Sequence, residues 1–133
     1  MIEGLSHITF IVKDLDRMEE LLTTVLDARK VSGSADNLDS NSKERFFDIA
    51  GLWIAIIEGE PLSRGSYNHV AFKIADADYD EYSARISLLG LRFGKDRPRG
   101  AGEGRSIYFY DYDNHLFELH SGTLEERLQH HAR

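Results

Sequence analysis

The segment from Tyr108 to Gly122 places three candidate metal ligands, His115, Glu118 and His120, within six positions. Alternate side chains of a β-strand share a face, so Glu118 and His120 would point one way and His115 the other. The strand by itself therefore nominates a glutamate and histidine pair. Because the chain has no cysteine, imidazole and carboxylate are its available ligands, and these suit Mn, Fe, Zn or Ni.

An internal repeat adds two further histidines to this set. The stretch SHITFIVKD, residues 6–14, aligns without a gap on NHVAFKIAD, residues 68–76, so that His7 corresponds to His69 at an offset of 62 residues. Both stretches alternate as strands, and each histidine lies on the face away from the apolar one. Thr9 shares the face of His7. The apolar faces comprise Ile8, Phe10 and Val12 in one copy and Val70, Phe72 and Ile74 in the other.

The same offset compares the last strand of the two copies. It places Ile56 opposite Glu118 and Glu58 opposite His120. One copy thus offers His69 and Glu118, whereas the other offers His7 and an apolar residue. Three protein ligands with open positions are typical of a catalytic metal, because a structural metal site is closed.

The elements that position these residues form two βαβββ modules, at about residues 4–60 and 66–122 of a single domain, 1–133. Asp14 is a candidate cap for the first helix, and Asp78 with Glu81 forms a capping box for the second. Gly90 is the expected stop of the second helix. A further capping box, Thr123 with Glu126, begins a short C-terminal helix at about 123–131. The fold class is α+β.

Composition narrows the function classes. A chain of 133 residues with 41% apolar residues can bury a core without disulfides. Its net charge of −7 argues against broad binding of nucleic acid or an anionic membrane. It shows neither a signal-like start nor a run long enough to span a membrane, so a cytoplasmic protein is expected. The basic, glycine-rich segment 92–105 is either an anion-binding loop or a solvated hairpin.

The repeats, the start GLSHITFIV and the segment GEGRSIYFYDYDNHLFELHSGTLEERL resemble the vicinal oxygen chelate (glyoxalase, bleomycin resistance and dioxygenase-like) superfamily, and within it the fosfomycin resistance proteins. SKERFF, which contains Glu44, is similar to the FosX type, which hydrates the drug. The resemblance implies cupped sheets, a Mn(II) site at His7, His69 and Glu118, and a domain-swapped homodimer with shared sites. Other divalent metals remain possible.

The resemblance also implies an activity, the hydration of the fosfomycin epoxide to a vicinal diol phosphonate. The metal would activate the oxirane oxygen, and Glu44 would accept a proton from the attacking water. Thr9 is a further candidate at the reacting centre. Arg127 is the expected cation for the phosphonate, and hydroxyl groups would complete its binding. The other candidate substrate contacts are Tyr67, Arg97, Ser106 and Tyr108.

Several alternatives remain at this stage. A thiol transferase of the same fold would act on fosfomycin without needing Glu44. A related hydrolase could act on another small epoxide or phosphonate. An antibiotic-sequestering protein would need no metal ligands, and an extradiol dioxygenase would use the same ligand types around Fe(II).

Overall fold

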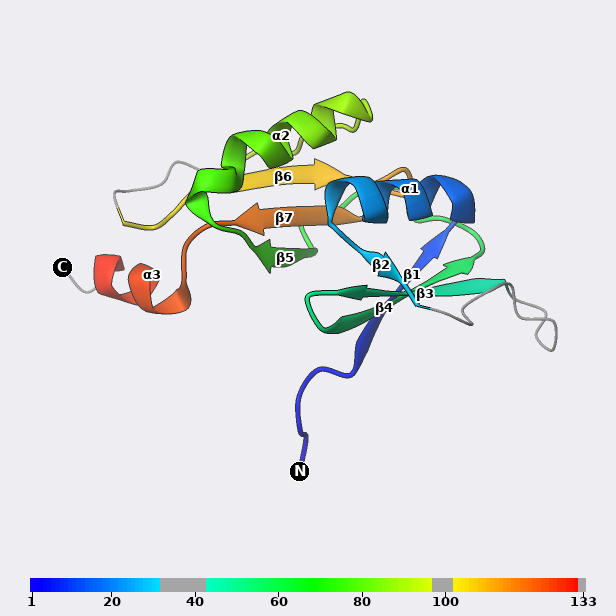
Figure 1. Cartoon of the computed structure of the whole chain (residues 1–133), viewed down its shortest axis with the longest axis horizontal. Coiled ribbons are helices and arrows are strands. Elements are labelled where there is room, and N and C mark those ends of the chain that lie inside the picture. Colours follow the sequence, from blue (N-terminus) through cyan, green and yellow to red (C-terminus); the bar gives the residue numbers. More distant parts are fainter. Residues whose placement is uncertain (32–42, 97–101, 132–133) are drawn as a thin grey trace. The chain divides into compact units, whose positions relative to one another are not determined.

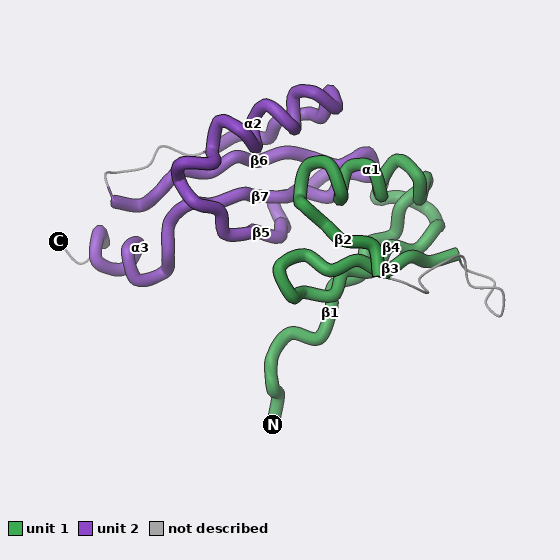
Figure 2. Tube along the Cα trace, viewed as in Figure 1, with its two compact units in different colours: residues 1–63 green, residues 64–133 purple. Residues whose placement is uncertain are grey.

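The computed structural model describes residues 1–31, 43–96 and 102–131. It divides into two compact units, Met1–Ser63 and Arg64–Arg133 (Figure 2). No helix within the described ranges is long and apolar enough to span a membrane.

The first unit is a four-stranded sheet with one helix (Figure 1). Its sheet has the order β1-β4-β3-β2, in which β1 pairs in parallel with β4 and the other pairs are antiparallel. Asp14 caps α1 as predicted, because its carboxylate accepts a hydrogen bond from the Arg17 amide at 3.1 Å. The elements are β1 (His7–Val12), α1 (Leu15–Val25), β2 (Arg29–Lys30), β3 (Glu44–Ile49) and β4 (Leu52–Glu58).

The second unit is a three-stranded sheet of order β5-β7-β6, with α2 along it and α3 after it (Figure 1). In the described residues, a single bridge between Phe93 and Phe109 is found where the first unit has β2. The elements are β5 (His69–Lys73), a 3₁₀ turn η1 (Asp76–Asp78), α2 (Tyr79–Leu88), β6 (Ser106–Tyr110), β7 (Leu116–His120) and α3 (Leu124–His131).

The helix ends of this unit confirm two predictions and correct one. Thr123 and Glu126 form the expected capping box, each side chain bonding the other residue's amide at 3.1 and 3.0 Å. Gly90 ends the second helical segment with φ of +66°, as a C-terminal stop requires. The capping box at Asp78 is wrong, because the Asp78 side chain makes no cap hydrogen bond and the η1 turn leads directly into α2.

Strand register also corrects the predicted partner of Glu118. Thr9 pairs with Ala55 in the first sheet, and Ala71 pairs with Glu118 in the second. Ala55, not Ile56, therefore holds the equivalent position. Glu44 pairs with Ile57, but Ser106, its match at the offset of 62, pairs with His120, so the second hairpin holds one residue more between paired positions. A shift of one residue moves every later side chain to the other face of a strand. Ile56 is fully buried on the helix-covered face.

The predicted faces of the first strands are confirmed. Phe10 and Val12 are buried, whereas His7 and Thr9 on the opposite face are exposed within their unit. The apolar core of the first unit lies between this face of the sheet and α1, whose residues Leu15, Met18, Leu21, Leu22 and Val25 are buried. Each sheet thus presents its polar strand face away from its helix.

Candidate metal centre and substrate pocket

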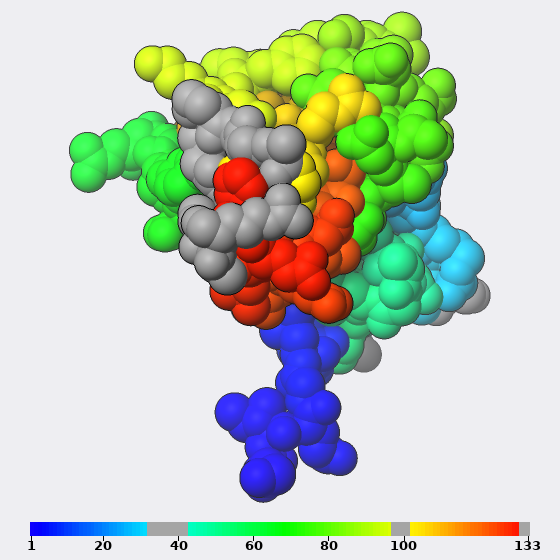
Figure 3. Space-filling model, turned by 90° about the vertical axis from the view of Figure 1, so that its left-hand side faces the viewer, coloured from blue at the N-terminus to red at the C-terminus, as the bar shows by residue number. Residues whose placement is uncertain are grey.

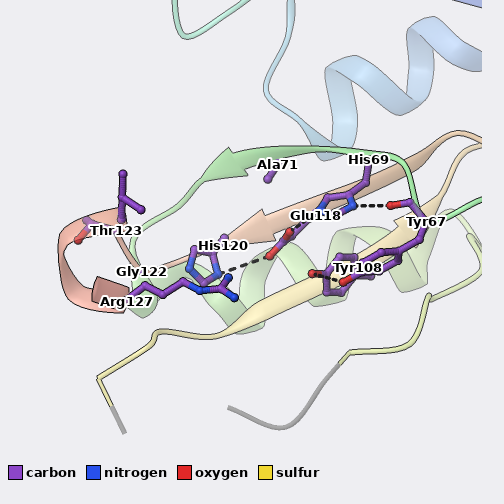
Figure 4. Close-up of a pocket in the computed structure, with 10 residues that line it drawn as sticks. Tyr67, His69, Ala71, Tyr108, Glu118, His120, Gly122, Thr123 and Arg127 are labelled. Carbon is purple, nitrogen blue, oxygen red and sulfur yellow. Dashed lines mark hydrogen bonds and ion pairs between the residues drawn. The ribbon is translucent and has the colours of Figure 1, made fainter. Parts of the chain in front are cut away.

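His69 and Glu118 come together from the neighbouring parallel strands β5 and β7. Ala71 lies directly opposite Glu118, and His69 precedes Ala71 by two residues, so both side chains share a face. The distance from His69 Nε2 to Glu118 Oε1 is 3.0 Å (Figure 4). Two of the three predicted metal ligands are therefore adjacent within one unit.

The hydrogen bond at the other ring nitrogen fixes the tautomer of His69. Its Nδ1 lies 2.7 Å from the backbone carbonyl oxygen of Tyr67, which can only accept, so Nδ1 carries a proton. In a neutral ring, Nε2 then presents a lone pair to the Glu118 carboxylate. Both atoms can then bind one cation, because a lone pair and a carboxylate oxygen face each other at 3.0 Å. Ligand atoms about 2.1 Å from one metal, at a right angle, are about 3.0 Å apart, so the pair fits a divalent ion.

Glu118 is nearly buried and is held by hydroxyl groups. Ser106 donates to Oε2 at 2.6 Å, and the Tyr108 hydroxyl also bonds the carboxylate. Burial raises the pKa of Glu118, but the hydrogen bonds from Ser106 and Tyr108 lower it, and the net shift of the pKa is downward. The carboxylate is consequently ionised and ready to bind a cation.

The two tyrosines of the site form a hydroxyl pair. Tyr67 and Tyr108 have their hydroxyl oxygens 3.1 Å apart, and the edge of the His69 ring meets the Tyr108 ring. Burial, the bond to Tyr67 and the charge of Glu118 raise the pKa of Tyr108 well above its ordinary value. The Tyr108 hydroxyl therefore stays protonated and donates a hydrogen bond. Sequence reasoning assigned Ser106 and Tyr108 to the phosphonate, whereas here both hydroxyls bond Glu118.

A cavity of about 560 Å³ opens beside the His69 and Glu118 pair. Arg127 reaches it from α3, which follows directly on β7 and lies at the surface, red in Figure 3. A cationic group thus faces the same space as the candidate metal ligands (Figure 4). The lining residues are Tyr67, His69, Ala71, Tyr108, Glu118, His120, Gly122, Thr123, Leu124 and Arg127.

His7, Thr9 and Glu44 belong to the first unit and lie on the sheet face away from α1. The pairing of Glu44 with Ile57, and of Ile57 with Ile11, places Glu44 on the face of His7 and Thr9. In neither unit do three histidine or acidic side chains of the described residues form a ready metal cage. Arg97 lies outside the described residues.

His7 is held by two neighbours. Ser6 Oγ lies 3.0 Å from its Nδ1, and its ring centroid is 4.2 Å from that of Trp53 on β4. Sequence reasoning did not identify Trp53 as a neighbour of His7, since their pairing depends on the parallel register of β1 and β4.

Two histidines nominated by the opening segment lie outside the predicted ligand set. His115 packs in the turn between β6 and β7, where its Nδ1 is 2.7 Å from the Asp111 carboxylate. His120 lines the cavity, and its Nδ1 is 2.7 Å from Ser106 Oγ. The link from His120 through Ser106 to Glu118 was not predicted, because it depends on which residues of β6 and β7 pair.

Comparison with known proteins supplies a family and close relatives. Residues 4–119 match the family model described as the glyoxalase/bleomycin resistance protein/dioxygenase superfamily. The fosfomycin resistance protein FosX of Mesorhizobium japonicum is 59% identical over 133 residues, covering 100% of this chain and 96% of that protein. The metallothiol transferase FosB of Staphylococcus epidermidis is 32% identical, with 98% and 92% covered.

Solved structures give the same result. A mutant of FosX from Listeria monocytogenes, in complex with Mn(II) and 1S,2S-dihydroxypropylphosphonic acid, superposes with a TM-score of 0.87. It is 54% identical, and the match covers 98% of this chain and 99% of that one. FosX from the same organism in complex with Mn(II) and sulfate also has a TM-score of 0.87, at 53% identity and the same coverage.

Proposed function

Since the chain belongs to the glyoxalase/bleomycin resistance protein/dioxygenase superfamily, we propose that it is a fosfomycin hydrolase, a metal-dependent enzyme that hydrates the epoxide to a vicinal diol phosphonate. The observation that carries the proposal is His69 Nε2 facing the Glu118 carboxylate at 3.0 Å, beside a cavity that Arg127 also lines. An ionised carboxylate, an imidazole and a guanidinium suit a substrate that binds a metal and carries an anion.

His69 and Glu118 would bind Mn(II), and His7 from a first unit is the proposed third ligand. The FosX of Listeria monocytogenes binds Mn(II), which supports this choice of metal. A divalent cation held there would supply Lewis-acid activation of the oxirane oxygen. His69 is prepared for this role because the Tyr67 carbonyl holds its ring orientation and tautomer.

Glu44 is the proposed general base. Its neighbour Arg45 points to the other face, where it pairs with Asp16 at 2.8 Å and Glu19 at 3.1 Å, so Arg45 does not neutralise it. Glu44 would take one proton from water while the water oxygen bonds to an epoxide carbon. The bond between this carbon and the epoxide oxygen breaks at the same time. The proton then returns to the opened oxygen, and the product is a diol. Thr9 shares this face and is the proposed hydroxyl partner of the reacting groups.

Arg127 is the proposed anchor for the phosphonate, because a guanidinium can donate two parallel hydrogen bonds to its oxygens. Tyr67 lines the same cavity and is exposed, so its hydroxyl can reach a substrate. Ser106 and Tyr108 already donate to Glu118 and would have to turn to reach a phosphonate oxygen. Arg97 remains a proposed contact from its sequence alone.

The proposal includes a homodimer with shared sites, in which His7 of one chain joins His69 and Glu118 of the other. It also includes a cytoplasmic location. Thiol transfer is the less favoured activity, because identity falls from 59% with the FosX of Mesorhizobium japonicum to 32% with the metallothiol transferase of Staphylococcus epidermidis.

The test is a reaction of the purified protein with Mn(II) and fosfomycin in the absence of any thiol, followed by phosphorus NMR. The expected product is the diol phosphonate, and added glutathione, cysteine or bacillithiol should not be required. A product that forms only with a thiol, and carries it, would replace the hydrolase assignment by a thiol transferase.

A further inference from the structure

His120 begins a chain of two short hydrogen bonds that ends on the candidate metal ligand Glu118. His120 on β7 lies directly opposite Ser106 on β6, and its Nδ1 is 2.7 Å from Ser106 Oγ. The same Oγ lies 2.6 Å from Glu118 Oε2. Ser106 is 2% exposed, so water does not replace these contacts readily.

The direction of the chain follows from proton counting. A serine hydroxyl carries one proton, and that of Ser106 is donated to the Glu118 carboxylate, which can only accept. Ser106 Oγ must therefore accept from His120, whose Nδ1 carries the proton. This bond fixes the hydroxyl rotation of Ser106, which a lone serine would otherwise be able to change.

The backbone beside His120 leaves room for its ring. A Cβ at Gly122 would lie 2.8 Å from His120 Nε2 and 2.4 Å from the Glu103 carbonyl oxygen. The Gly122 backbone thus lies close to the Nε2 edge of the His120 ring, on the side opposite the bond from Nδ1 to Ser106. His120 is confined between this glycine and the serine that it orients.

We propose that His120 is a positioning residue that, through Ser106, fixes the Glu118 carboxylate for metal binding. The inference rests on the metal site of the proposed function. Ser106 holds Oε2, so that Oε1 stays directed at His69, 3.0 Å away. Outer partners of metal ligands typically change metal affinity by about 10- to 100-fold. We expect His120 to change the metal affinity by a factor of this size, although it does not itself bind the metal.

The test compares three substitutions at His120 by titration with Mn(II), with unbound Mn(II) measured by electron paramagnetic resonance. H120N places an amide nitrogen near the position of Nδ1, whereas H120Q places it near Nε2. H120F keeps the ring size but has no donor. H120F and H120Q should weaken Mn(II) binding by about tenfold or more, and H120N should restore most of it.

A second arm separates positioning from a direct effect. In an S106A background the hydrogen-bonded link is broken and only the direct 3.5 Å contact between His120 Nδ1 and Glu118 Oε2 remains, so H120F should weaken Mn(II) binding much less than it does in the wild type. H130N serves as the control for losing a histidine outside the cavity, and thermal unfolding checks that every variant is folded. Binding equal to wild type in H120F, or an undiminished loss in the S106A background, would overturn the inference. A wild-type protein that binds no Mn(II) would overturn the metal site itself.

Discussion

The ring nitrogen Nε2 of His69 faces the Glu118 carboxylate at 3.0 Å, and Nδ1 on the other side of the ring donates to the Tyr67 carbonyl oxygen. Strand pairing holds the two residues at this separation, since β5 and β7 are neighbours in one sheet. An imidazole nitrogen and an ionised carboxylate at this distance are ligands that a divalent metal can bind together.

Replacing Glu118 should therefore abolish tight metal binding. E118Q keeps the shape of the side chain but removes its charge, and we expect a loss of Mn(II) affinity greater than the roughly 100-fold effect of an outer partner. Electron paramagnetic resonance titration measures it. H120F should lose less, and the reverse order would mean that the ligand was misidentified.

Arg127 should govern substrate binding and leave the metal unaffected. Hydrogen bonds to charged groups contribute about 1.5–3 kcal/mol, so R127A should raise KM for fosfomycin about tenfold or more. Mn(II) affinity should not change. R64A removes another exposed arginine as a control. A KM equal to that of wild type in R127A would exclude this arginine as the phosphonate anchor.

The lowered pKa of Glu118 predicts how the stability of the metal-free protein depends on pH. A carboxyl whose pKa is lower in the folded state contributes stability above its unfolded pKa, and loses it as pH falls through the folded value. S106A removes a lowering hydrogen bond, so it should reduce the free energy of unfolding by about 1–3 kcal/mol near neutral pH.

The difference between S106A and wild type should then shrink in acid, because protonated Glu118 no longer benefits from the donor. Urea unfolding with a chelator present, from neutral pH into the acid range, measures this. S87A is the control for losing a hydroxyl on an exposed helix residue. A difference that stays constant or grows as pH falls would contradict the assignment of this carboxyl.

Shared sites predict complementation between two inactive variants. H7A and E118A should each be inactive alone, but a mixed dimer would contain one intact site, made by His7 of one chain and the second unit of the other. Co-expression and purification through two tags should recover activity. If each site is built within one chain, the mixture would stay inactive.

Much of this site could be predicted from strand alternation, which placed Glu118 and His120 on one face and His115 on the other. The repeat placed His7 and His69 at matched positions. The position matching Glu118 could not be obtained from a constant offset, because the connection before β7 has an extra residue, and Ala55 rather than Ile56 is equivalent. The outcome for ligation is the same, since neither side chain can bind a metal.

The hydrogen-bond acceptors of Ser106 and Tyr108 could not be predicted from the sequence. Ser106 and Tyr108 were both predicted as hydroxyl donors to the phosphonate. Tyr108 lines the cavity, whereas Ser106 is buried and is not among the lining residues. Both hydroxyls donate to Glu118, which follows only from the pairing of β6 with β7. Arg127 was assigned by resemblance, since a basic residue on an exposed helix carries no other signal. Its place in the cavity depends on the capping box that begins α3 immediately after β7.

The most direct test of the account is turnover in ¹⁸O-labelled water, with Mn(II), fosfomycin and no thiol, followed by mass spectrometry of the product. Wild type and the control E58Q should form the diol with one labelled oxygen. E44Q should bind Mn(II) normally but lose about 100- to 10,000-fold in rate, the range typical of a general base. No diol from the wild type, or undiminished hydration by E44Q, would contradict the proposed chemistry.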